Sequence, residues 1–490
     1  MSDHIDDSSL GDRAKRSDWV AASPGLDDAI NSLAHDLAVE RSSFVNHALR
    51  LARPGPVPPL RFARHVGALN IARLRWAVRT LPNDISEQRW NDPGTWLKDS
   101  AAEWMRDQLA MLGPSAVEIA RIIAQSEGMA PGVVVEEIKR RPITIDPMNA
   151  LVVREIVQRA FGDQVRRIDP LPITYTAITQ LHGAELADGK RVMVRVRRPG
   201  VDRDLHADAR VSATMVYPLE QLIPALREPH PLGFVEMATR QLLEESDLRN
   251  EALNTAELGI IIEELGLSGV EVARPIPGMA TRRAAVFERL DGRPFAQAHQ
   301  SLDVDKTVAS LVGVTIDAAL ECGGFHIDMA PEHLMVLDNG NLGIVGCGSM
   351  GHFDLQTRRA ALLYLTSVLS GDFENQVESM RLAGAVPEGT DIEALVHDLS
   401  TTEALQPATM MMGGEESMVG GLKEAMLVLL RHKIRPPLEE VLFVRNVFML
   451  RNLFASLSPD VSMMMALMPL LQKLPELNAR LNPRNEDLPS

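Results

Sequence analysis

Residues 324–354 read GFHIDMAPEHLMVLDNGNLGIVGCGSMGHFD, in which an aspartate precedes a hairpin turn and a Gly-containing turn. This is the layout of a site for phosphoryl transfer from ATP. Such chemistry asks a protein mainly to position the acceptor and to neutralise charge, with side-chain oxygens holding Mg²⁺. Asp328 is the candidate catalytic residue, because its carboxylate could position an acceptor hydroxyl or a water molecule.

The two positions at which this layout expects metal ligands carry His333 and Gly346. A neutral imidazole is a poor ligand for Mg²⁺, and glycine has no side-chain oxygen. A transition-metal site made of Asp328, His333 and Cys347 is conceivable, but its spacing matches no standard zinc pattern. We therefore expect no metal and no cofactor, with ATP and Mg²⁺ as the alternative.

A strand is expected over VMVRVRRPGV, directly after a turn at Ala187-Asp188-Gly189. Three valines alternate with Met193, Arg195 and Arg197 there, and a period of two with β-branched residues is typical of a strand. A second short strand is expected in AAVFERLDG, which contains Glu288. Helical patterns dominate elsewhere, so the fold class is expected to be α+β.

The composition of the chain disfavours some classes of function. The chain has 490 residues, 45% of them hydrophobic, and a formal charge of −16. That charge disfavours nucleic-acid binding, which needs a basic surface. Cys322 and Cys347 are the only cysteines, which fits a reducing compartment. We see no signal peptide and no apolar run long enough to cross a membrane, so a cytoplasmic location is expected.

The elements predict a two-lobed arrangement with a small antiparallel sheet, a large helical lobe and additional N-terminal helices. The expected parts are a disordered N-terminus (1–25), an N-terminal helical region (26–110), signature helices covering the active site (111–160), a small lobe (161–292), a helical lobe (293–457) and a C-terminal tail (458–490). The stretch VLFVRNVFMLRNLFASL (441–457) is amphipathic, and we expect core packing there before contact with a membrane or partner.

Four segments in this order resemble the UbiB/AarF family of atypical protein-kinase-like proteins. They are LGPSAVEIAR (112–121), PITYTAITQLHGAEL (172–186), LLEESDLRNEALN (242–254) and GFHIDMAPEHLMVLDNGNLGIVGCG (324–348). In the family these segments are a signature helix, an Ala-rich nucleotide loop, an acidic helix and the catalytic loop with its DFG strand. The resemblance covers roughly residues 110–360 and implies a kinase-like fold.

The resemblance also implies roles around a nucleotide. Arg195 replaces the strand lysine, and Glu245 matches the glutamate that orients that lysine. Met193 stands where a small residue normally leaves room for adenine. Gln180 and His182 survive from the nucleotide loop.

Glu288 is a further candidate for nucleotide contact. The resemblance places the retained catalytic aspartate at Asp328, and the lost metal ligands at His333 and Gly346.

The signature helix has changed as well, because its lysine is Glu118 and its glutamine is Arg121. One hypothesis is that a Glu118–Arg195 or Arg121–Glu251 ion pair fills the empty phosphate site. Such a pair would keep the kinase-like fold intact while the site no longer binds phosphate.

Three functions compete. The first is a pseudokinase with a binding or regulatory role, linked through the family to isoprenoid-quinone or lipid metabolism, with a protein or isoprenoid lipid as partner and peripheral membrane contact. The second is a divergent ATPase or kinase that uses Asp328 as base and recruits Asp338 or Asp354 for metal, although Asp354 also suits a helix cap. The third is a cytosolic lipid carrier with an apolar groove.

Overall fold

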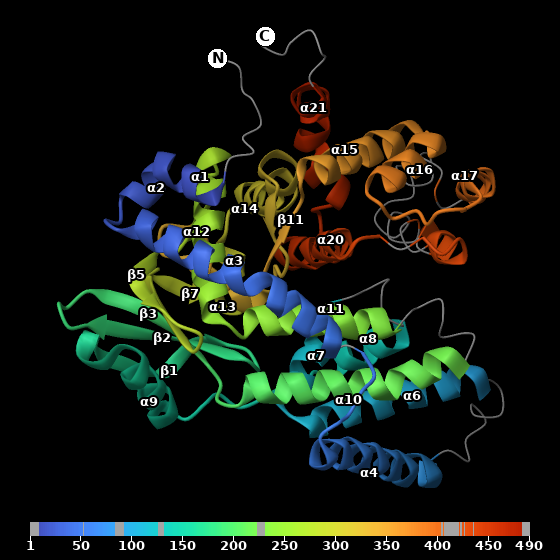
Figure 1. The fold of residues 1–490 in the computed structure, drawn as a ribbon, viewed down its shortest axis with the longest axis horizontal. Helices are drawn as coiled ribbons and strands as arrows, with labels where there is room; N and C mark the ends of the chain where they lie inside the picture. Colours follow the sequence, from blue (N-terminus) through green and yellow to red (C-terminus); the bar gives the residue numbers. More distant parts are fainter. Residues whose placement is uncertain are drawn as a thin grey trace. The chain divides into compact units, whose positions relative to one another are not determined.

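The computed structural model describes residues 9–51, 53–83, 93–125, 132–222, 231–402, 405, 421, 424–425, 427–434 and 436–482. The chain forms two compact units (Figure 1). We call Asp36–Asn250 with Met279–Val286 the sheet unit, and Met1–His35, Glu251–Gly278 and Phe287–Ser490 the helical unit. The expected boundary between residues 292 and 293 does not coincide with this division, because Glu251–Gly278 groups with the helical unit.

The five-stranded sheet has the strand order β1-β2-β3-β6-β5; it lies mainly in the sheet unit, while Pro275–Gly278 and Phe287–Glu288, parts of its last two strands, group with the helical unit. Its strands are β1 (Val165–Tyr175), β2 (Thr179–Leu186), β3 (Arg191–Arg197), β5 (Pro275–Ala280) and β6 (Ala284–Glu288). The first three pair antiparallel, and the expected turn joins β2 to β3, with Gly189 at φ +87°. Positive φ costs a glycine little, so the turn prediction at Ala187–Gly189 is confirmed.

Helices make up the rest of the sheet unit. They are α4 (Pro59–Asn83), α6 (Pro93–Leu112), α7 (Pro114–Ala124), α8 (Gly132–Arg140), α9 (Ala150–Phe161), α10 (Val201–Leu222) and α11 (Pro231–Glu245). A further helix, α3 (Leu26–Leu51), runs from one unit into the other. The predicted helices at 61–80 and 95–125 correspond to α4 and to the pair α6 and α7.

The helical unit holds two small sheets and a set of helices. Its strands are β4 (Val270–Val272), β7 (Gly292–Pro294), β8 (Gly324–His326), β9 (Leu334–Leu337), β10 (Leu342–Ile344) and β11 (Met350–His352). Its helices include α1 (Leu10–Arg16), α2 (Asp18–Ala21), α12 (Leu248–Glu264), α14 (Val304–Val312), α15 (Leu355–Ser370), α16 (Phe373–Leu382), α17 (Ile392–Thr401), α20 (Leu438–Leu457) and α21 (Met463–Leu481). The ten residues Gly313–Cys322 form a π-helix, which leads directly to β8.

The prediction that residues 1–25 are disordered is wrong where the structure describes them. Residues 10–21 form α1 and α2, which pack on α12 (Figure 1). A Cβ atom at Gly259 would come within 2.5 Å of the Trp19 ring, so glycine makes room for the indole there. The short helices are held by this tertiary packing rather than by their own propensity, which is why their polar sequence misled the prediction.

The C-terminal third is mostly helical, as predicted. Helix α20 buries apolar side chains along its length, including Phe448 and Phe454, so core packing of residues 441–457 is confirmed. The tail expected from residue 458 contains a 19-residue helix, α21. Among the described residues, no helix is both long and apolar enough to span a bilayer.

Candidate functional site

The β1–β2 turn lies where the resemblance places the nucleotide loop, and its backbone N–H groups are already bonded. Thr176 Oγ1 accepts from the N–H groups of Ile178 and Thr179, both at 3.1 Å. The N–H of Thr176 donates to the Thr179 carbonyl at 2.9 Å. The turn therefore satisfies these three donors internally, although such donors are what a nucleotide loop offers to phosphate.

The remaining donor of this turn, the N–H of Ala177, is bonded to Glu118. Helix α7 begins with Gly113 at φ +108° and Pro114, which fixes the entry of the helix. Glu118 Oε2 accepts from Ala177 at 3.2 Å, while the other carboxylate oxygen pairs with Arg121 one turn along α7. The Glu118 side chain is 1% exposed, so a buried carboxylate closes the turn.

The hypothesis of a Glu118–Arg195 or Arg121–Glu251 pair stays a prediction. The Glu118 carboxylate contacts Arg121 and the backbone of the turn. Glu251 belongs to the helical unit, whereas the other three residues belong to the sheet unit. The structure adds a contact between the signature helix and the turn that the sequence did not suggest.

Arg195 and Met193 are both buried on β3. Their exposed fractions are 2% and 1%. Arg195 Nη1 donates to Thr179 Oγ1 at 3.1 Å, so the guanidinium contacts the strand that follows the turn. Met193 lies opposite Gly183 of β2. A long thioether buried on this strand agrees with the view that Met193 fills space, and its contact with adenine stays untested.

Gln180 and His182 face the same side of β2, two residues apart, and are fully buried. His182 Nδ1 lies 2.9 Å from the Asp169 carbonyl oxygen, and Nε2 lies 3.1 Å from Gln180 Oε1. Burial lowers the pKa of His182, so a neutral ring is favoured. His182 thus ties β2 to β1, and the predicted nucleotide contact of His182 and Gln180 is not tested by this geometry.

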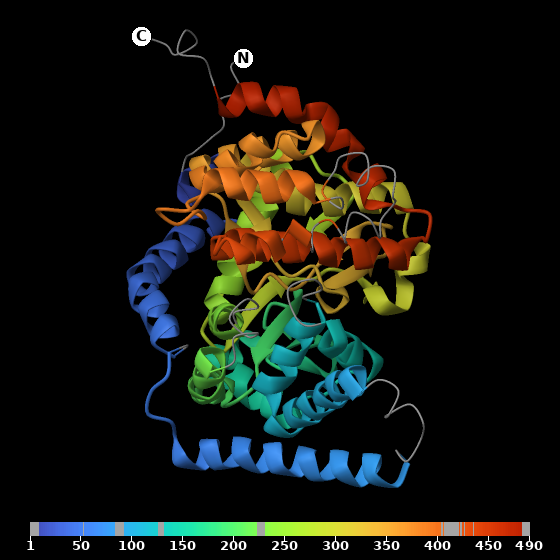
Figure 2. The same ribbon diagram turned by 90° about the vertical axis from the view of Figure 1, so that its right-hand side faces the viewer.

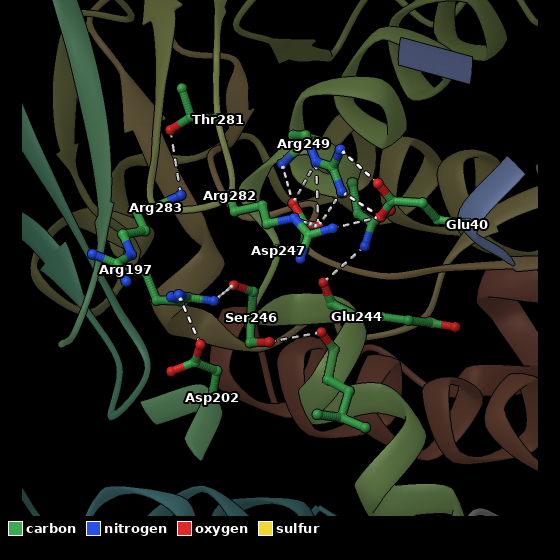
Figure 3. Close-up of polar contacts among 12 residues, drawn as sticks. Glu40, Arg197, Asp202, Glu244, Ser246, Asp247, Arg249, Thr281, Arg282 and Arg283 are labelled. Carbon is green, nitrogen blue, oxygen red and sulfur yellow. Dashed lines mark hydrogen bonds and ion pairs between the residues drawn. The ribbon is translucent and has the colours of Figure 1, made fainter. Parts of the chain in front are cut away.

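Glu245 ends α11, and its Oε1 accepts from Gln241 at 2.7 Å. The segment that follows it is anchored by a charge network, which Figure 3 shows. Arg249 donates to Asp247 at 2.7 Å and to Glu40 at 2.8 Å, and Arg282 also reaches Glu40 at 2.7 Å. The hydrogen bond to Asp247 is the main reason why the pKa of Arg249 is raised.

A second arginine holds the same segment from the sheet. Arg197 of β3 donates to the Ser246 carbonyl oxygen at 2.7 Å and pairs with Asp202 at 3.3 Å (Figure 3). Its pKa is lowered, chiefly by burial. The motif residues after Glu245 thus serve to fix the backbone between α11 and α12.

In the helical unit, Asp328 follows β8 in a braced loop. His326 Nδ1 accepts the N–H of Asp328 at 3.0 Å, so the ring proton sits on Nε2, which donates to the Gly346 carbonyl oxygen at 2.5 Å. Complete burial, with His333 nearby, lowers the pKa of His326 to about 4. The neutral imidazole therefore ties the catalytic-loop position to the segment that should carry the DFG aspartate.

Helix α20 braces the same loop from the other side. Asn446 donates to the His326 carbonyl oxygen and accepts the N–H of Met329. Arg445 donates to the Ile327 carbonyl oxygen at 3.1 Å. Both side chains are almost fully buried, at 1% and 0% exposed. These bonds fix the backbone of the loop from the side of α20.

His333 and Gly346 fit each other. A Cβ atom at Gly346 would lie 2.5 Å from Cδ2 and 2.7 Å from Cγ of the His333 ring. Gly346 is not among the glycines with positive φ, so space rather than backbone conformation requires glycine there. The ring is fixed by Nδ1, 3.0 Å from the Asp328 carbonyl oxygen and 3.7 Å from Asp328 Oδ2. An imidazole occupies the volume that a metal-binding side chain at position 346 would need.

The carboxylates considered as replacement ligands have other surroundings. Asp354 caps α15 by accepting the N–H of Thr357 at 2.7 Å, which confirms the cap prediction. Asp338 is exposed in the turn after β9. Glu288, the further candidate for nucleotide contact, pairs with Arg274 at 3.2 Å, and its predicted contact with a nucleotide is not tested by this geometry. In the part of the chain that the structure describes, no group of three or more His, Cys, Asp or Glu is placed to hold a metal ion.

Three contributors were missed from sequence. Thr176 had a signal, because a hydroxyl residue inside a tight turn often accepts from the next N–H groups. His326 had a weaker signal, namely that it lies two residues before Asp328 in the sequence. Asn446 had none, since it lies 117 residues from Met329, whose N–H it accepts.

Comparison with known proteins agrees with the sequence resemblance. The profile of the ABC1 atypical kinase-like domain matches residues 143–380. An uncharacterized, chloroplastic aarF domain-containing protein kinase of Arabidopsis thaliana is 25% identical over 306 residues, which cover 60% of this chain and 57% of that protein. A probable protein kinase UbiB of Marinobacter nauticus is 27% identical over 248 residues, covering 49% of this chain and 45% of that protein.

The matched part of the chain thus spans about half the length of these curated relatives. A probable protein kinase UbiB of Xylella fastidiosa is matched over more of its length, 78%, at 20% identity. A Mycobacterium tuberculosis protein solved as a complex with erythromycin is matched at a TM-score of 0.39 and 18% identity, over 71% of this chain and 98% of that chain. The sequence matches place this chain beside atypical kinase-like domains.

Proposed function

Because this chain belongs to the UbiB/AarF family of atypical kinase-like proteins, with an α+β kinase-like fold, we propose that it is a pseudokinase. Its role is to bind or regulate a partner rather than to transfer phosphate. The family resemblance adds isoprenoid-quinone or lipid metabolism as the field in which that partner is to be sought.

One observation carries the proposal: the His333 ring fills the space beside Gly346. Phosphoryl transfer needs carboxylate or amide oxygens that hold Mg²⁺ against the phosphates. Position 346 offers no side chain, and the ring at position 333 offers nitrogen in place of oxygen. Restoring an aspartate at 346 would require His333 to move, so the loss involves two coupled positions.

The β1–β2 turn supports the same conclusion independently. Its four N–H groups donate within the protein, one of them to the buried carboxylate of Glu118. A phosphate entering this turn would have to break those bonds and approach a negative charge. Desolvation makes such like-charge proximity costly.

The divergent-ATPase alternative keeps Asp328 but loses one of its two recruited ligands, because Asp354 is a helix cap. It then depends on Asp338, an exposed turn residue. The lipid-carrier alternative and the cytoplasmic location stay predictions.

The test combines stability and turnover. Melting of the wild-type chain is followed with ATP or ADP at millimolar concentration, with and without Mg²⁺ or Mn²⁺, and phosphate release is measured in parallel. A ligand present at a hundred times its Kd would stabilise the fold by about 2.7 kcal/mol, a visible rise in the melting midpoint. We expect neither a metal-dependent rise nor turnover.

Asp328→Asn is the matched control, because it removes the retained carboxylate and keeps the shape of the side chain. Turnover or a metal-dependent rise that this variant abolishes would contradict the pseudokinase proposal and favour the divergent enzyme. The absence of both turnover and a metal-dependent rise in the wild type and in the variant would support the proposal.

A further inference from the structure

Helix α4 is a basic segment in an acidic protein. Its sequence, PLRFARHVGALNIARLRWAVRTLPN, contains five arginines and one histidine but no aspartate or glutamate. The whole chain, by contrast, carries a formal charge of −16. Arg61 and His65 are paired with an aspartate of the protein, so the remaining arginines of this helix, with no acidic residue beside them on it, are what points to a negatively charged partner.

One face of α4 is fixed to the sheet unit. Arg61 donates to both carboxylate oxygens of Asp208 on α10, at 2.7 and 2.8 Å, and His65 Nε2 lies 2.9 Å from the same carboxylate. Ala68 and Ala72 continue this face, with exposed fractions of 5% and 0%. Asp208 is 2% exposed, so a buried bidentate pair holds the helix in one rotation about its axis.

The opposite side of α4 carries large apolar side chains. Leu60 is 89% exposed, Ile71 is 47% exposed and Leu74 is 65% exposed. At 3.6 residues per turn these three positions share one stripe along the helix. Arg64 and Arg75 are exposed and lie next to the stripe on the helix. Figure 2 shows α4 as a long helix along the lower margin of the sheet unit.

We propose that this face of α4, defined by Leu60, Ile71 and Leu74 with Arg64 and Arg75, docks on an anionic phospholipid bilayer. A helix with an apolar stripe, flanking arginines and low overall hydrophobicity lies in the plane of a membrane interface. The apolar side chains enter the acyl boundary while the guanidinium groups contact lipid phosphates. Anionic lipid supplies the negative charge that this helix lacks, because α4 contains no aspartate or glutamate.

A bilayer fits the shape of this surface better than an acidic peptide does. The apolar residues stand out on a single convex helix, which a flat interface can accept along its whole length. A peptide would need pockets or a strand edge to gain specificity. Fixed rotation of α4 also sets one orientation of the sheet unit on the membrane, because the Arg61–Asp208 pair determines which face is outward.

The test is sedimentation of the full chain with vesicles of phosphatidylcholine alone or with phosphatidylglycerol. We expect binding to the mixed vesicles that falls as salt is raised, and at least about tenfold weaker binding to the neutral ones. The double variant Ile71→Glu/Leu74→Glu should lose at least about tenfold in vesicle partitioning, because each change places a charge in the apolar stripe.

Leu151→Glu is the matched control. Leu151 lies on α9 of the same unit and is 70% exposed, so the substitution is chemically identical and lies away from α4. It should bind as the wild type does. Melting curves of both variants distinguish loss of binding from loss of folding, and Arg75→Gln, a mild change on the same helix, should weaken binding by a smaller factor.

Four results would overturn the proposal. They are no binding to anionic vesicles, equal binding to neutral vesicles, equal loss in Leu151→Glu, and complete competition by millimolar inorganic phosphate, which would mean a phosphate site without a bilayer. Binding of poly-glutamate through α4 in the absence of vesicle binding would likewise overturn it, in favour of an acidic protein partner. Nucleotide binding does not enter any of these readouts.

Discussion

The β1–β2 turn of the sheet unit and the Gly346 position of the helical unit are closed by different means. At the turn, polar groups of the protein satisfy donors that phosphate would use, through Glu118 and Thr176. At Gly346, the volume of the His333 ring excludes a side chain. Hydrogen bonds can be removed one at a time, whereas a steric clash introduced at one partner is relieved only when the other partner changes as well. The two regions should therefore respond differently to substitution.

The largest expected effect is at the steric contact. Gly346→Ala should destabilise the fold by about 3 kcal/mol, because the added methyl group overlaps the buried His333 ring. Denaturant unfolding measures it. Gly67→Ala is the matched control, since nothing lies within 4 Å of its Cβ, and alanine there should stabilise α4 slightly, by about 0.5–1 kcal/mol.

The double variant sharpens this comparison. Adding His333→Ala to Gly346→Ala should recover part of the lost stability, so that the two changes couple by at least about 1 kcal/mol. Strictly additive changes would mean that the ring does not exclude the methyl group, and the fit between the two residues would be disproved.

Acid should weaken the helical unit through His326. The unfolded imidazole has a pKa of 6.5, and the folded one is lowered to about 4 by burial and by His333. The unfolded chain then takes up a proton that the folded chain refuses, so stability is complete above pH 6.5 and is lost as pH falls toward 4. The loss is on the order of 3 kcal/mol from this group. Unfolding curves across that range in wild type and His326→Gln isolate it, and an unchanged slope in the variant would contradict the assignment.

A middle-sized effect is expected at the polar contact. Glu118→Ala leaves the buried N–H of Ala177 and the Arg121 guanidinium without this carboxylate, which should cost about 2 kcal/mol. Glu118→Gln retains an acceptor and should cost less. Equal losses in the two variants, measured by denaturant unfolding, would show that the contact to Ala177 carries no weight.

The smallest effect is expected at Thr176. Thr176→Val keeps the shape of the side chain but removes the acceptor for two N–H groups, and about 1 kcal/mol should be lost. Thr176→Ser keeps the hydroxyl and should be near neutral. Amide hydrogen exchange at Ile178 and Thr179 should quicken in the valine variant only; protection that survives would mean that the hydroxyl does not close the turn.

Many of the helices and strands could be predicted from the sequence, because the patterns that indicate them are local. Alternation at Val192 to Val196 marks β3, and the acidic residue before α15 marks its cap at Asp354. The helices at residues 10–21 could not be predicted, because the Trp19 ring packs where Gly259 has no side chain, and Gly259 lies 240 positions away in the sequence.

The candidate site divides in the same way. The sequence predicted that His333 and Gly346 replace metal ligands, but it did not show their mutual fit, because that fit depends on the pairing of β9 with β10, which brings the residues at the open end of the hairpin together. The bond between the Glu118 carboxylate and the N–H of Ala177 was not expected from the sequence either. Backbone donors carry no residue type, so sequence patterns do not reveal them.

The central claim is that both contact regions for ATP are occupied by the protein's own groups. Calorimetric titration of the wild-type chain with ATP in the presence of Mg²⁺ tests it most directly. The account predicts no binding heat up to millimolar nucleotide. Saturable binding that requires Mg²⁺ and disappears in Asp328→Asn would contradict it. Nucleotide and metal would then bind in spite of the contacts that Glu118 and His333 make.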